Sequence, residues 1–247
     1  MRTIGIVAHS AEGGALCFQT ACREGQARLG PHLHPTIVVS AIPMGLSMDG
    51  WRDGDHAVVG ELLSQGVRQV AAAGAEFYVC PDNTAHIVLE PLAATLPIPG
   101  LHIADVVGGE IRRHGWTRVG LLGTEWTMTG PVYPGRLAGA GVELLVPDDA
   151  TRADLHDRIF DELCQGIFEP RTTDAFLGAI EGLAARGAEA VILGCTEIPL
   201  IVSRDNSPLP VLDSTRLLAA GAVTEALEAR SPEAAGGWLR IPAAAPA

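Results

Sequence analysis

The amino-acid sequence predicts an α/β protein made of two similar halves, each with a parallel β-sheet covered by helices. Short β-branched runs alternate with longer stretches of helical period, which is the pattern of parallel strands joined by helical crossovers. A repeated spacing of glycines and strand ends indicates the division into halves. Strands are expected at residues 3–8, 36–41, 76–80, 118–123, 142–146, 190–194 and 211–213.

Helical periodicity and glycine placement support this reading of the segments between strands. Residues 56–73 and residues 154–168 each carry an apolar stripe at i, i+3, i+4 spacing, which predicts two amphipathic helices. Four glycines lie just before strands, where a preceding helix must end, and are expected to act as C-caps: Gly74, Gly115, Gly141 and Gly187.

The repeat joins the first strand of each half to a polar residue at the end of a later strand. Gly5 lies 77 positions before Asp82, and Gly120 lies 75 positions before Cys195. This predicts one half from residues 1–102, completed by a returning helix at 214–230, and a second half from residues 103–213. An approximate twofold axis would relate them. Residues 231–247 carry no pattern and are expected to form a flexible tail.

Composition limits the classes of function. The 247 residues can bury one large core or two small ones. A net charge of -12 argues against a nucleic-acid partner, which requires a basic surface. The same charge means that local donors, rather than long-range attraction, must hold an anionic substrate.

Cysteine usage and hydropathy predict a cytoplasmic protein. The five cysteines are widely spaced, without the spacing of metal ligands, so we expect reduced thiols and no metal site. No apolar run approaches the roughly 20 residues that span a bilayer. The chain opens on a predicted strand rather than a signal peptide.

Asp82 and Cys195 are the candidate proton-transfer groups. Ligands bind beyond the carboxyl ends of parallel strands, so two facing halves would bring both side chains to one cleft. Cys195 precedes an expected helix start at 196–199, whose partial positive charge would lower the thiol pKa toward neutrality. The alternative is a buried, inert cysteine. Asp82 would need a raised pKa to act as a general base. Its alternative is a helix N-cap, because residues 85–89 have a helical pattern.

Further polar residues near these two groups are candidates for holding a substrate carboxylate. Amide and hydroxyl donors come from Asn83, Thr84, Thr124 and Thr196. Ser10 follows the first strand, and Arg52 is a possible counter-charge, although most arginines in such loops are solvated. His86 is expected to be a polar surface residue. Residues 9–14 lack both G-x-G-x-x-G and the P-loop lysine, which argues against nucleotide binding.

Several motifs resemble the aspartate/glutamate racemase family. They are Asn-Thr-Ala-His at 83–86, Leu-Gly-Thr-Glu-Trp-Thr-Met at 122–128 and Gly-Cys-Thr-Glu-Ile-Pro at 194–199, and the segment 161–168 is also similar. The resemblance extends to about residue 228. It implies two Rossmann-like domains around a central cleft, usually in a homodimer, and catalysis without pyridoxal phosphate, other cofactors or metal.

The resemblance also implies a mechanism, from which Asp82 departs. Family members typically place two cysteines across the cleft, one removing the α-proton and the other returning a proton from the opposite face. Cys195 matches the second cysteine, but Asp82 stands where the first would be. Some relatives carry threonine there and strongly prefer one enantiomer, and arylmalonate decarboxylases keep only the second cysteine. Residues 8–14 replace the family's Gly-Gly-Met pattern.

Three hypotheses follow. The first is a cofactor-independent racemase or epimerase, acting on an amino acid of the aspartate/glutamate type with Asp82 and Cys195 as its acid/base pair. The second is a decarboxylase or isomerase working through an enolate that Cys195 protonates, although a charged Asp82 would repel a malonate carboxylate. The third is a non-catalytic ligand-binding protein on a racemase scaffold. The loops do not specify the substrate's side chain.

Overall fold

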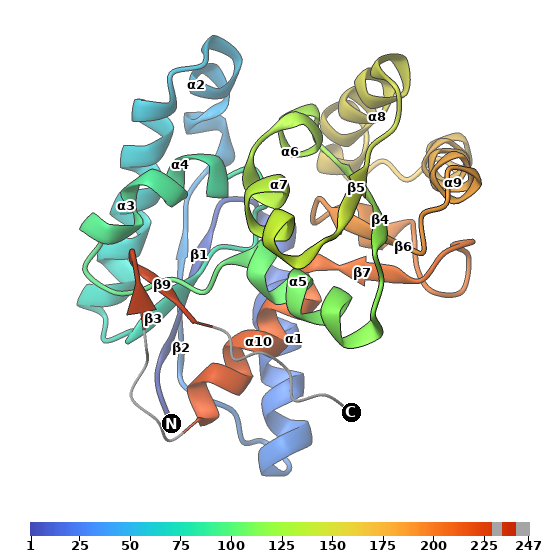
Figure 1. The fold of residues 1–247 in the computed structure, drawn as a ribbon. Helices are drawn as coiled ribbons and strands as arrows, with labels where there is room; N and C mark the ends of the chain where they lie inside the picture. The colour runs from blue at the N-terminus through green and yellow to red at the C-terminus, as the bar shows by residue number, and fades with distance from the viewer. Residues whose placement is uncertain (229–233, 241–247) are drawn as a thin grey trace. The chain divides into compact units, whose positions relative to one another are not determined.

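Two parallel β-sheets, one in each of two units of the chain, form the framework of the protein (Figure 1). The computed structural model describes residues 1–228 and 234–240. Of the described residues, unit 1 contains Met1–Val106 and those from Thr215 onward, and unit 2 contains Val107–Ser214. The predicted α/β class with parallel sheets is confirmed.

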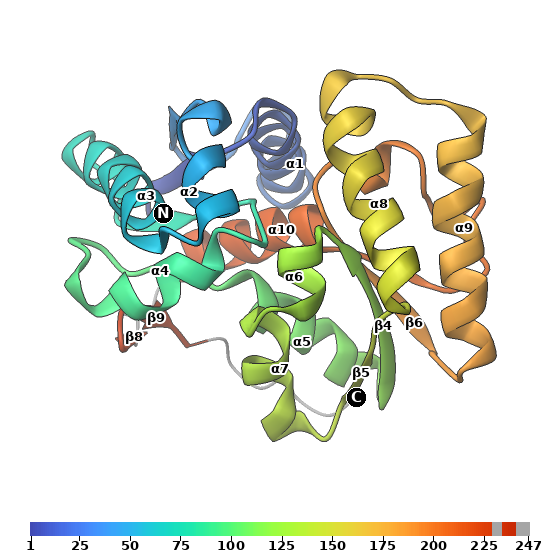
Figure 2. The same ribbon diagram turned by 90° about the horizontal axis from the view of Figure 1, so that it is seen from above.

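The sheet of unit 1 has the order β2-β1-β3 and is parallel throughout. Its strands are β1 (Ile4–Ala8), β2 (Ile37–Ala41) and β3 (Phe77–Val79). Helix α1 (Ala11–Leu29) crosses from β1 to β2, and helix α3 (His56–Ala72) crosses from β2 to β3. Figures 1 and 2 show these helices on opposite faces of the sheet, as right-handed crossovers in opposite directions require.

Short helices of unit 1 follow the carboxyl ends of β2 and β3. A 3-10 turn η1 (Met44–Leu46) and helix α2 (Met48–Asp53) lie between β2 and α3. Helix α4 (His86–Leu92) and turn η2 (Ala93–Thr95) follow β3. Helix α5 (Ile103–His114) leads into unit 2. From Thr215 on, helix α10 (Ser214–Leu227) belongs to unit 1, where Arg28 of α1 donates a hydrogen bond of 2.7 Å to the hydroxyl of Thr224.

The sheet of unit 2 has the order β5-β4-β6-β7 and is also parallel. Its strands are β4 (Arg118–Gly123), β5 (Glu143–Leu145), β6 (Ala190–Gly194) and β7 (Val211–Asp213). The remaining elements are α6 (Glu125–Thr129), α7 (Val132–Leu137), η3 (Ala138–Ala140), α8 (Asp149–Asp161), η4 (Leu163–Gln165), α9 (Pro170–Ala185) and η5 (Ile198–Leu200).

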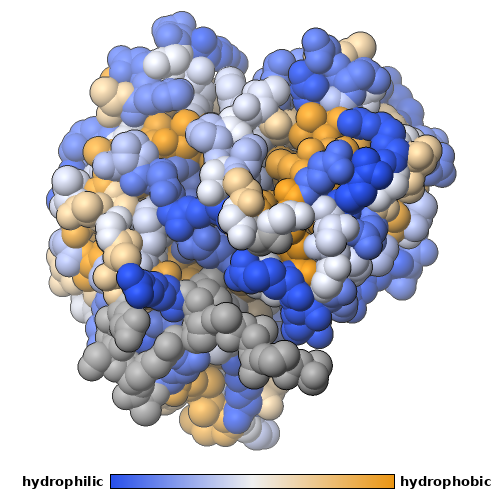
Figure 3. Space-filling model, in the orientation of Figure 1, coloured by the Kyte–Doolittle hydropathy of each residue, from blue (hydrophilic) through white to orange (hydrophobic). Residues whose placement is uncertain are grey.

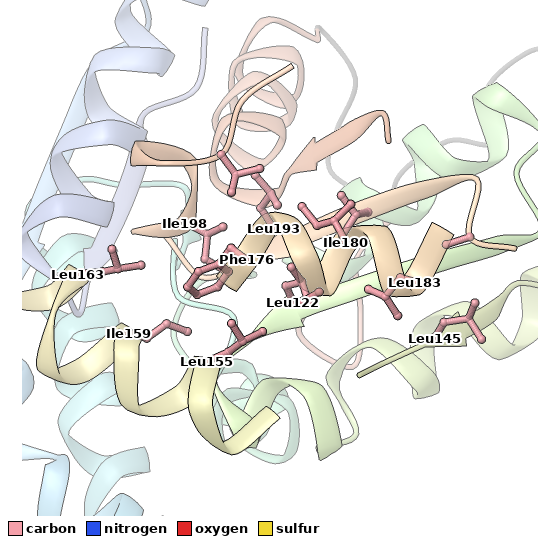
Figure 4. Packing of buried hydrophobic residues seen from close by; sticks show 14 residues of the cluster. Leu122, Leu145, Leu155, Ile159, Leu163, Phe176, Ile180, Leu183, Leu193 and Ile198 are labelled. Carbon is pink, nitrogen blue, oxygen red and sulfur yellow. The ribbon is translucent and has the colours of Figure 1, made fainter. Parts of the chain in front are cut away.

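Helices α8 and α9 cover one face of this sheet with an apolar core. Leu155 and Ile159 of α8 and Phe176 and Ile180 of α9 pack with Leu193 of β6, and all five side chains are buried (Figure 4). At about 1.5–3 kcal/mol for each fully buried large apolar side chain, this cluster contributes much of the stability of unit 2.

The repeated glycines have the same structural reason in both units. An added Cβ at Gly5 of β1 would lie 2.7 Å from Val70 of α3, and one at Gly120 of β4 would lie 2.9 Å from Leu183 of α9. Each glycine therefore lets a crossover helix approach the first strand of its sheet. Each of these strands pairs directly with the strand that leads to Asp82 or to Cys195.

The predicted strands are confirmed, and each begins and ends within one residue of the expected position. The four predicted glycine caps all have positive φ, between 68° and 97°. The predicted helix at 154–168 is wrong at both ends. Helix α8 begins earlier because Asp148 caps it by accepting a 2.9 Å hydrogen bond from the amide of Thr151. It ends at Asp161, and Gly166 then takes a left-handed conformation.

The predicted flexible tail at 231–247 needs correction in its described part. Residues 234–240 form a hairpin of β8 (Ala234–Ala235) and β9 (Trp238–Leu239), in which Trp238 and Leu239 are buried. The ring of Trp238 packs 5.9 Å from that of Tyr78 in β3. This isolated tryptophan was not predicted to be a core residue, and it is one. Residues 231–233 and 241–247 lie outside the described part.

The surface in Figure 3 is mostly hydrophilic or neutral, with separate apolar patches. Separate apolar residues are normal on a protein surface. Within residues 1–228 and 234–240, no helix combines the length and the hydropathy that a membrane span requires.

Candidate active site

Each unit carries its own group of polar residues at the carboxyl ends of its parallel strands, and each group is a candidate half-site. The first half-site comprises His9, Ser47, Asp82, Asn83 and Thr84 of unit 1. His9 follows β1 directly, and Asp82 follows the neighbouring strand β3 after two further residues. The pairing of β1 with β3 therefore brings the histidine and the carboxylate together.

His9 links Asp82 to Ser47. Its Nδ1 lies 2.6 Å from Oδ2 of Asp82, and its Nε2 lies 2.8 Å from Oγ of Ser47. The Ser47 hydroxyl donates a 2.8 Å hydrogen bond to the carbonyl of Met44 in turn η1. His9 and Ser47 are buried, whereas the side chain of Asp82 is 22% exposed. A solute can therefore reach this chain only at the carboxylate.

The pKa of Asp82 lies below its ordinary value of 3.8, contrary to the raised pKa expected for a general base. Burial raises this pKa, but the hydrogen bond and charge of His9 and the amide of Ala85 together outweigh it. The Ala85 amide donates to Oδ1 of Asp82 over 3.2 Å, so the carboxylate also caps the turn before α4. Asp82 is thus ionised at neutral pH.

His86 is buried, and the expectation that it lies on the surface is wrong. Its Nδ1 donates a 2.9 Å hydrogen bond to the carbonyl of Asp82, and its Nε2 accepts one of 3.3 Å from the amide of Ile103. Burial, followed by the proximity of His102, lowers its pKa from 6.5 to about 3. His86 therefore stays neutral and fixes the backbone of the turn that carries Asp82.

The second half-site comprises Thr124, Thr127, Cys195, Thr196 and Glu197 of unit 2. Cys195 follows β6, and its thiol donates a 2.9 Å hydrogen bond to Oε2 of Glu197. The hydroxyl of Thr196 donates to the same oxygen over 2.7 Å. The Glu197 side chain is buried, so the thiol faces a carboxylate that is shielded from water.

The pKa of Cys195 is raised well above its ordinary value of 9.0, so the expected shift toward neutrality is wrong. Burial is the largest cause, followed by repulsion between a thiolate and Glu197. The expected helix is also missing, because residues 198–200 form only the 3-10 turn η5. Without a helix there is no macrodipole to stabilise a thiolate. Cys195 is a protonated thiol at neutral pH.

The predicted substrate-binding residues lie beside these groups in their respective units. Asn83 and Thr84 are buried in the turn after Asp82. Ser10 caps α1 by accepting a 3.0 Å hydrogen bond from the amide of Gly13. Thr124 caps α6 through the amide of Thr127.

Arg52 lies on α2 and pairs with Asp49 at 3.6 Å. Its side chain is 66% exposed, which is the geometry of the solvated alternative.

Among the half-site residues absent from the predicted site are His9, Ser47 and Glu197. His9 carried a usable signal, because it directly follows a strand that neighbours the one leading to Asp82. Glu197 lies two positions beyond Cys195 and could have been tested as its partner. Ser47 carried no such signal, since only the fold brings its loop to His9. Across the described residues, no group of three or more His, Cys, Asp or Glu side chains could hold a metal ion.

Residues 9–222 match the sequence profile of the family described as Asp/Glu/Hydantoin racemase. The chain belongs to this family. Both half-sites lie within the matched residues.

Similar proteins agree with this assignment. A broad-specificity amino-acid racemase of Bacillus subtilis is 26% identical over 201 residues, which cover 80% of this chain and 85% of the relative. The crystal structure of a putative Asp/Glu racemase from Yersinia pestis has a TM-score of 0.84 at 33% identity, covering 92% of this chain and all of that one. An aspartate racemase homologue from Pyrococcus horikoshii has a TM-score of 0.77 at 27% identity, with the same coverage.

The racemase-family assignment confirms the resemblance seen in the sequence and the predicted enzyme class, an amino acid racemase and hence an isomerase.

Proposed function

We propose that the protein is a cofactor-independent racemase or epimerase that uses Asp82 and Cys195 on opposite faces of the carbon α to a carboxylate. The proposed substrate is an amino acid of the aspartate/glutamate type. The observation that carries the proposal is the complementary ionisation of the two groups. The lowered pKa of Asp82 and the raised pKa of Cys195 give one base and one acid at neutral pH. A two-base racemase requires both at once.

In one direction Asp82 takes the α-proton. The electron pair of the broken C–H bond passes into the substrate's carboxylate as an enolate. Cys195 then gives its proton to the opposite face, so the configuration inverts and a protonated Asp82 and a thiolate remain. Because Glu197 disfavours the thiolate, that thiolate is a strong base. It is therefore suited to remove the α-proton of the other enantiomer. Proton exchange with water restores the starting state.

We further propose that the turns at 82–85 and 195–197 hold the substrate carboxylate. Their polar side chains are the amide of Asn83 and the hydroxyls of Thr84 and Thr196, and Thr124 lies at the end of the neighbouring strand β4. Hydrogen bonds to the carboxylate stabilise the enolate more than the ground state, because negative charge accumulates on those oxygens as the proton leaves.

Incubation with a panel of amino acids in deuterium oxide tests the proposal. The two-base mechanism places deuterium in the inverted product before it appears in recovered substrate, as proton NMR and chiral chromatography can show. Asp82→Asn and Cys195→Ser should each abolish racemisation, whereas the matched control Cys22→Ser, in helix α1, should not. Racemisation retained by either site variant would refute the acid/base pair.

Decarboxylation of a malonate-type acid is a second candidate, favoured by the protonated state of Cys195. In that reaction carbon dioxide leaves, its bonding electrons form an enolate, and the thiol protonates the enolate, so Asp82 need not accept a proton. Carbon dioxide release from disubstituted malonates, with activity surviving in Asp82→Asn, would select this reaction. Racemisation that requires Asp82 would exclude it.

We also propose that the protein is a cytoplasmic homodimer. All five cysteines, which lie in the described part of the chain, are free thiols, as a reducing compartment favours. Val39 on the edge strand β2 is 45% exposed, and exposed strand edges invite pairing with a second chain. Light scattering of the purified protein and fractionation of cells test the two statements separately.

A further inference from the structure

The C-terminal hairpin of β8 and β9 brings a buried tryptophan to the β3 side of the sheet of unit 1. Gly100 forms the connection, because its amide donates a 2.9 Å hydrogen bond to the Gly237 carbonyl and its backbone also bridges Tyr78 of β3. An added Cβ at Gly100 would lie 2.6 Å from the rings of both Trp238 and Tyr78. Glycine at this position therefore lets the hairpin and its tryptophan pack closely against β3.

Trp238 packs against two histidines that lie behind the turn of Asp82. Its ring is stacked on that of His86, with 5.7 Å between the ring centroids and 24° between the planes. It meets the ring of His102 edge-on at 4.7 Å, and the two histidine rings are 4.5 Å apart. Trp238 is 5% exposed and each histidine 1%. The indole therefore helps to exclude water from the imidazole of His86.

His86 holds the backbone of Asp82 only as a neutral ring. Its Nδ1 donates to the Asp82 carbonyl over 2.9 Å, and its Nε2 accepts from the Ile103 amide over 3.3 Å. A backbone amide can only donate, so Nε2 must be the unprotonated nitrogen. A proton on Nε2 would point at the N–H of Ile103 and break that hydrogen bond. The turn is thus tied to the start of α5 while His86 is uncharged.

Burial keeps His86 neutral against its charged neighbours. Burial is the largest influence on its pKa and lowers it to about 3, and His102 lowers it further. The carboxylates of Asp82 and of Glu90, on α4, act in the opposite direction. Nε2 of His102 contacts Glu90 at 3.0 Å, and burial raises the pKa of Tyr78, which therefore stays uncharged. If water reached the ring of His86, the two carboxylates would favour its imidazolium form.

We infer that Trp238 is a positioning residue of the first half-site, which shields His86 from water and thereby preserves the two hydrogen bonds that fix the backbone of Asp82. The consequence for turnover rests on the proposed function. The shielding of His86 depends only on contacts within unit 1.

The inference is tested first without turnover, by NMR of the His86 ring as a function of pH. The wild-type ring should stay neutral down to about pH 4, whereas in Trp238→Ala its titration midpoint should rise by about two pH units, because burial of a histidine can shift its pKa by several units. A ring that stays neutral down to about pH 4 in folded Trp238→Ala would overturn the inference.

A control and a second variant make the NMR result specific. Trp116→Ala is the matched control, because Trp116 also stacks on a histidine, 4.2 Å from the ring of His114, but lies in unit 2. It should leave the His86 midpoint unchanged. Gly237→Ala decides the question if Trp238→Ala does not fold. Gly237 has a φ of 83°, and an added Cβ would overlap the backbone of Ala93, so the substitution displaces the hairpin while keeping its tryptophan. It should raise the His86 midpoint as well.

Kinetics then separates positioning from a general structural role. In Trp238→Ala, kcat/KM should acquire an acid limb whose midpoint equals that of His86 measured by NMR, and Trp238→Phe, which keeps an aromatic ring, should remove this limb. A uniform loss of activity at every pH, without such a limb, would overturn the inference. If the NMR results hold but no substrate exchanges its α-proton, the shielding of His86 stands and the proposed function fails.

Discussion

The substitution Glu197→Gln isolates the group that holds Cys195 in its thiol form. Glutamine has nearly the same shape and keeps an oxygen that can accept the thiol's hydrogen bond, but it removes the negative charge 2.9 Å from Sγ. Burial of Cys195 remains. We therefore expect the thiol pKa to fall, because a thiolate no longer faces a carboxylate.

The geometry sets the size of the fall. Two unit charges 2.9 Å apart repel each other by about 1.4 kcal/mol with the screening of bulk water and by about 6 kcal/mol at an effective dielectric constant of about 20. Since about 1.4 kcal/mol corresponds to one pKa unit, the fall should lie between about 1 and about 4 units. Because Glu197 is buried, the fall in the thiol pKa should exceed the lower of these two values.

The assay is the rate of alkylation by iodoacetamide as a function of pH. The signal of Cys195 is the difference between each protein and its Cys195→Ser counterpart, because four other thiols are present. Glu197→Asp keeps the negative charge, so the alkylation rate of Cys195 should keep its midpoint at high pH. A wild-type midpoint at or below 9.0, or a midpoint that Glu197→Gln leaves unchanged, would refute the reasoning. Under the proposed mechanism, Glu197→Gln should also lower kcat for the enantiomer that Cys195 would deprotonate.

Three further predictions concern pH and packing. Below about pH 6.5 the unfolded chain binds a proton at His86, whereas the folded protein does not bind it until about pH 3. The free energy of unfolding therefore decreases as the pH is lowered. Urea unfolding should show a loss of about 2 kcal/mol between about pH 7 and 5 that is missing in His86→Gln. Wild-type kcat/KM should be nearly flat from about pH 5 to 8, and a catalytic midpoint inside that window would contradict the two pKa shifts. Gly194→Ala would place a Cβ 2.9 Å from the Leu122 carbonyl and should destabilise by about 1–3 kcal/mol in thermal or urea unfolding, whereas Gly178→Ala, on open helix surface, should stabilise slightly.

The fold could be predicted because its signals are local and periodic. A buried parallel strand must be continuously apolar, and a helix that ends before a strand needs a left-handed residue, as the positive φ of Gly74 and Gly187 illustrates. The hairpin around Trp238 was missed because two-residue strands carry no period. The start of α8 was missed because Asp148 acts through a cap rather than through hydropathy.

The positions of Asp82 and Cys195 beyond strand ends could be predicted from the sequence, but their ionisation could not. Asp82 and Cys195 are found by counting from strand ends, whereas their pKa values depend on partners that folding brings near. His9 lies 73 positions from Asp82 along the chain, yet it reverses the expected direction of that pKa. For Cys195 the partner lies only two positions away, and the error came from expecting a helix where η5 forms.

Two buried contacts with carboxylates therefore give the two candidate groups opposite ionisation. In the first half-site the candidate group is itself the carboxylate, and the His9 hydrogen bond stabilises its charged form. In the second the carboxylate of Glu197 is the partner, and it destabilises the charged form of Cys195. Together the contacts favour the state with an ionised Asp82 and a protonated Cys195. The hydrogen bond of His9 thus offsets the effect of burial and keeps Asp82 in the base form that the proposed mechanism requires.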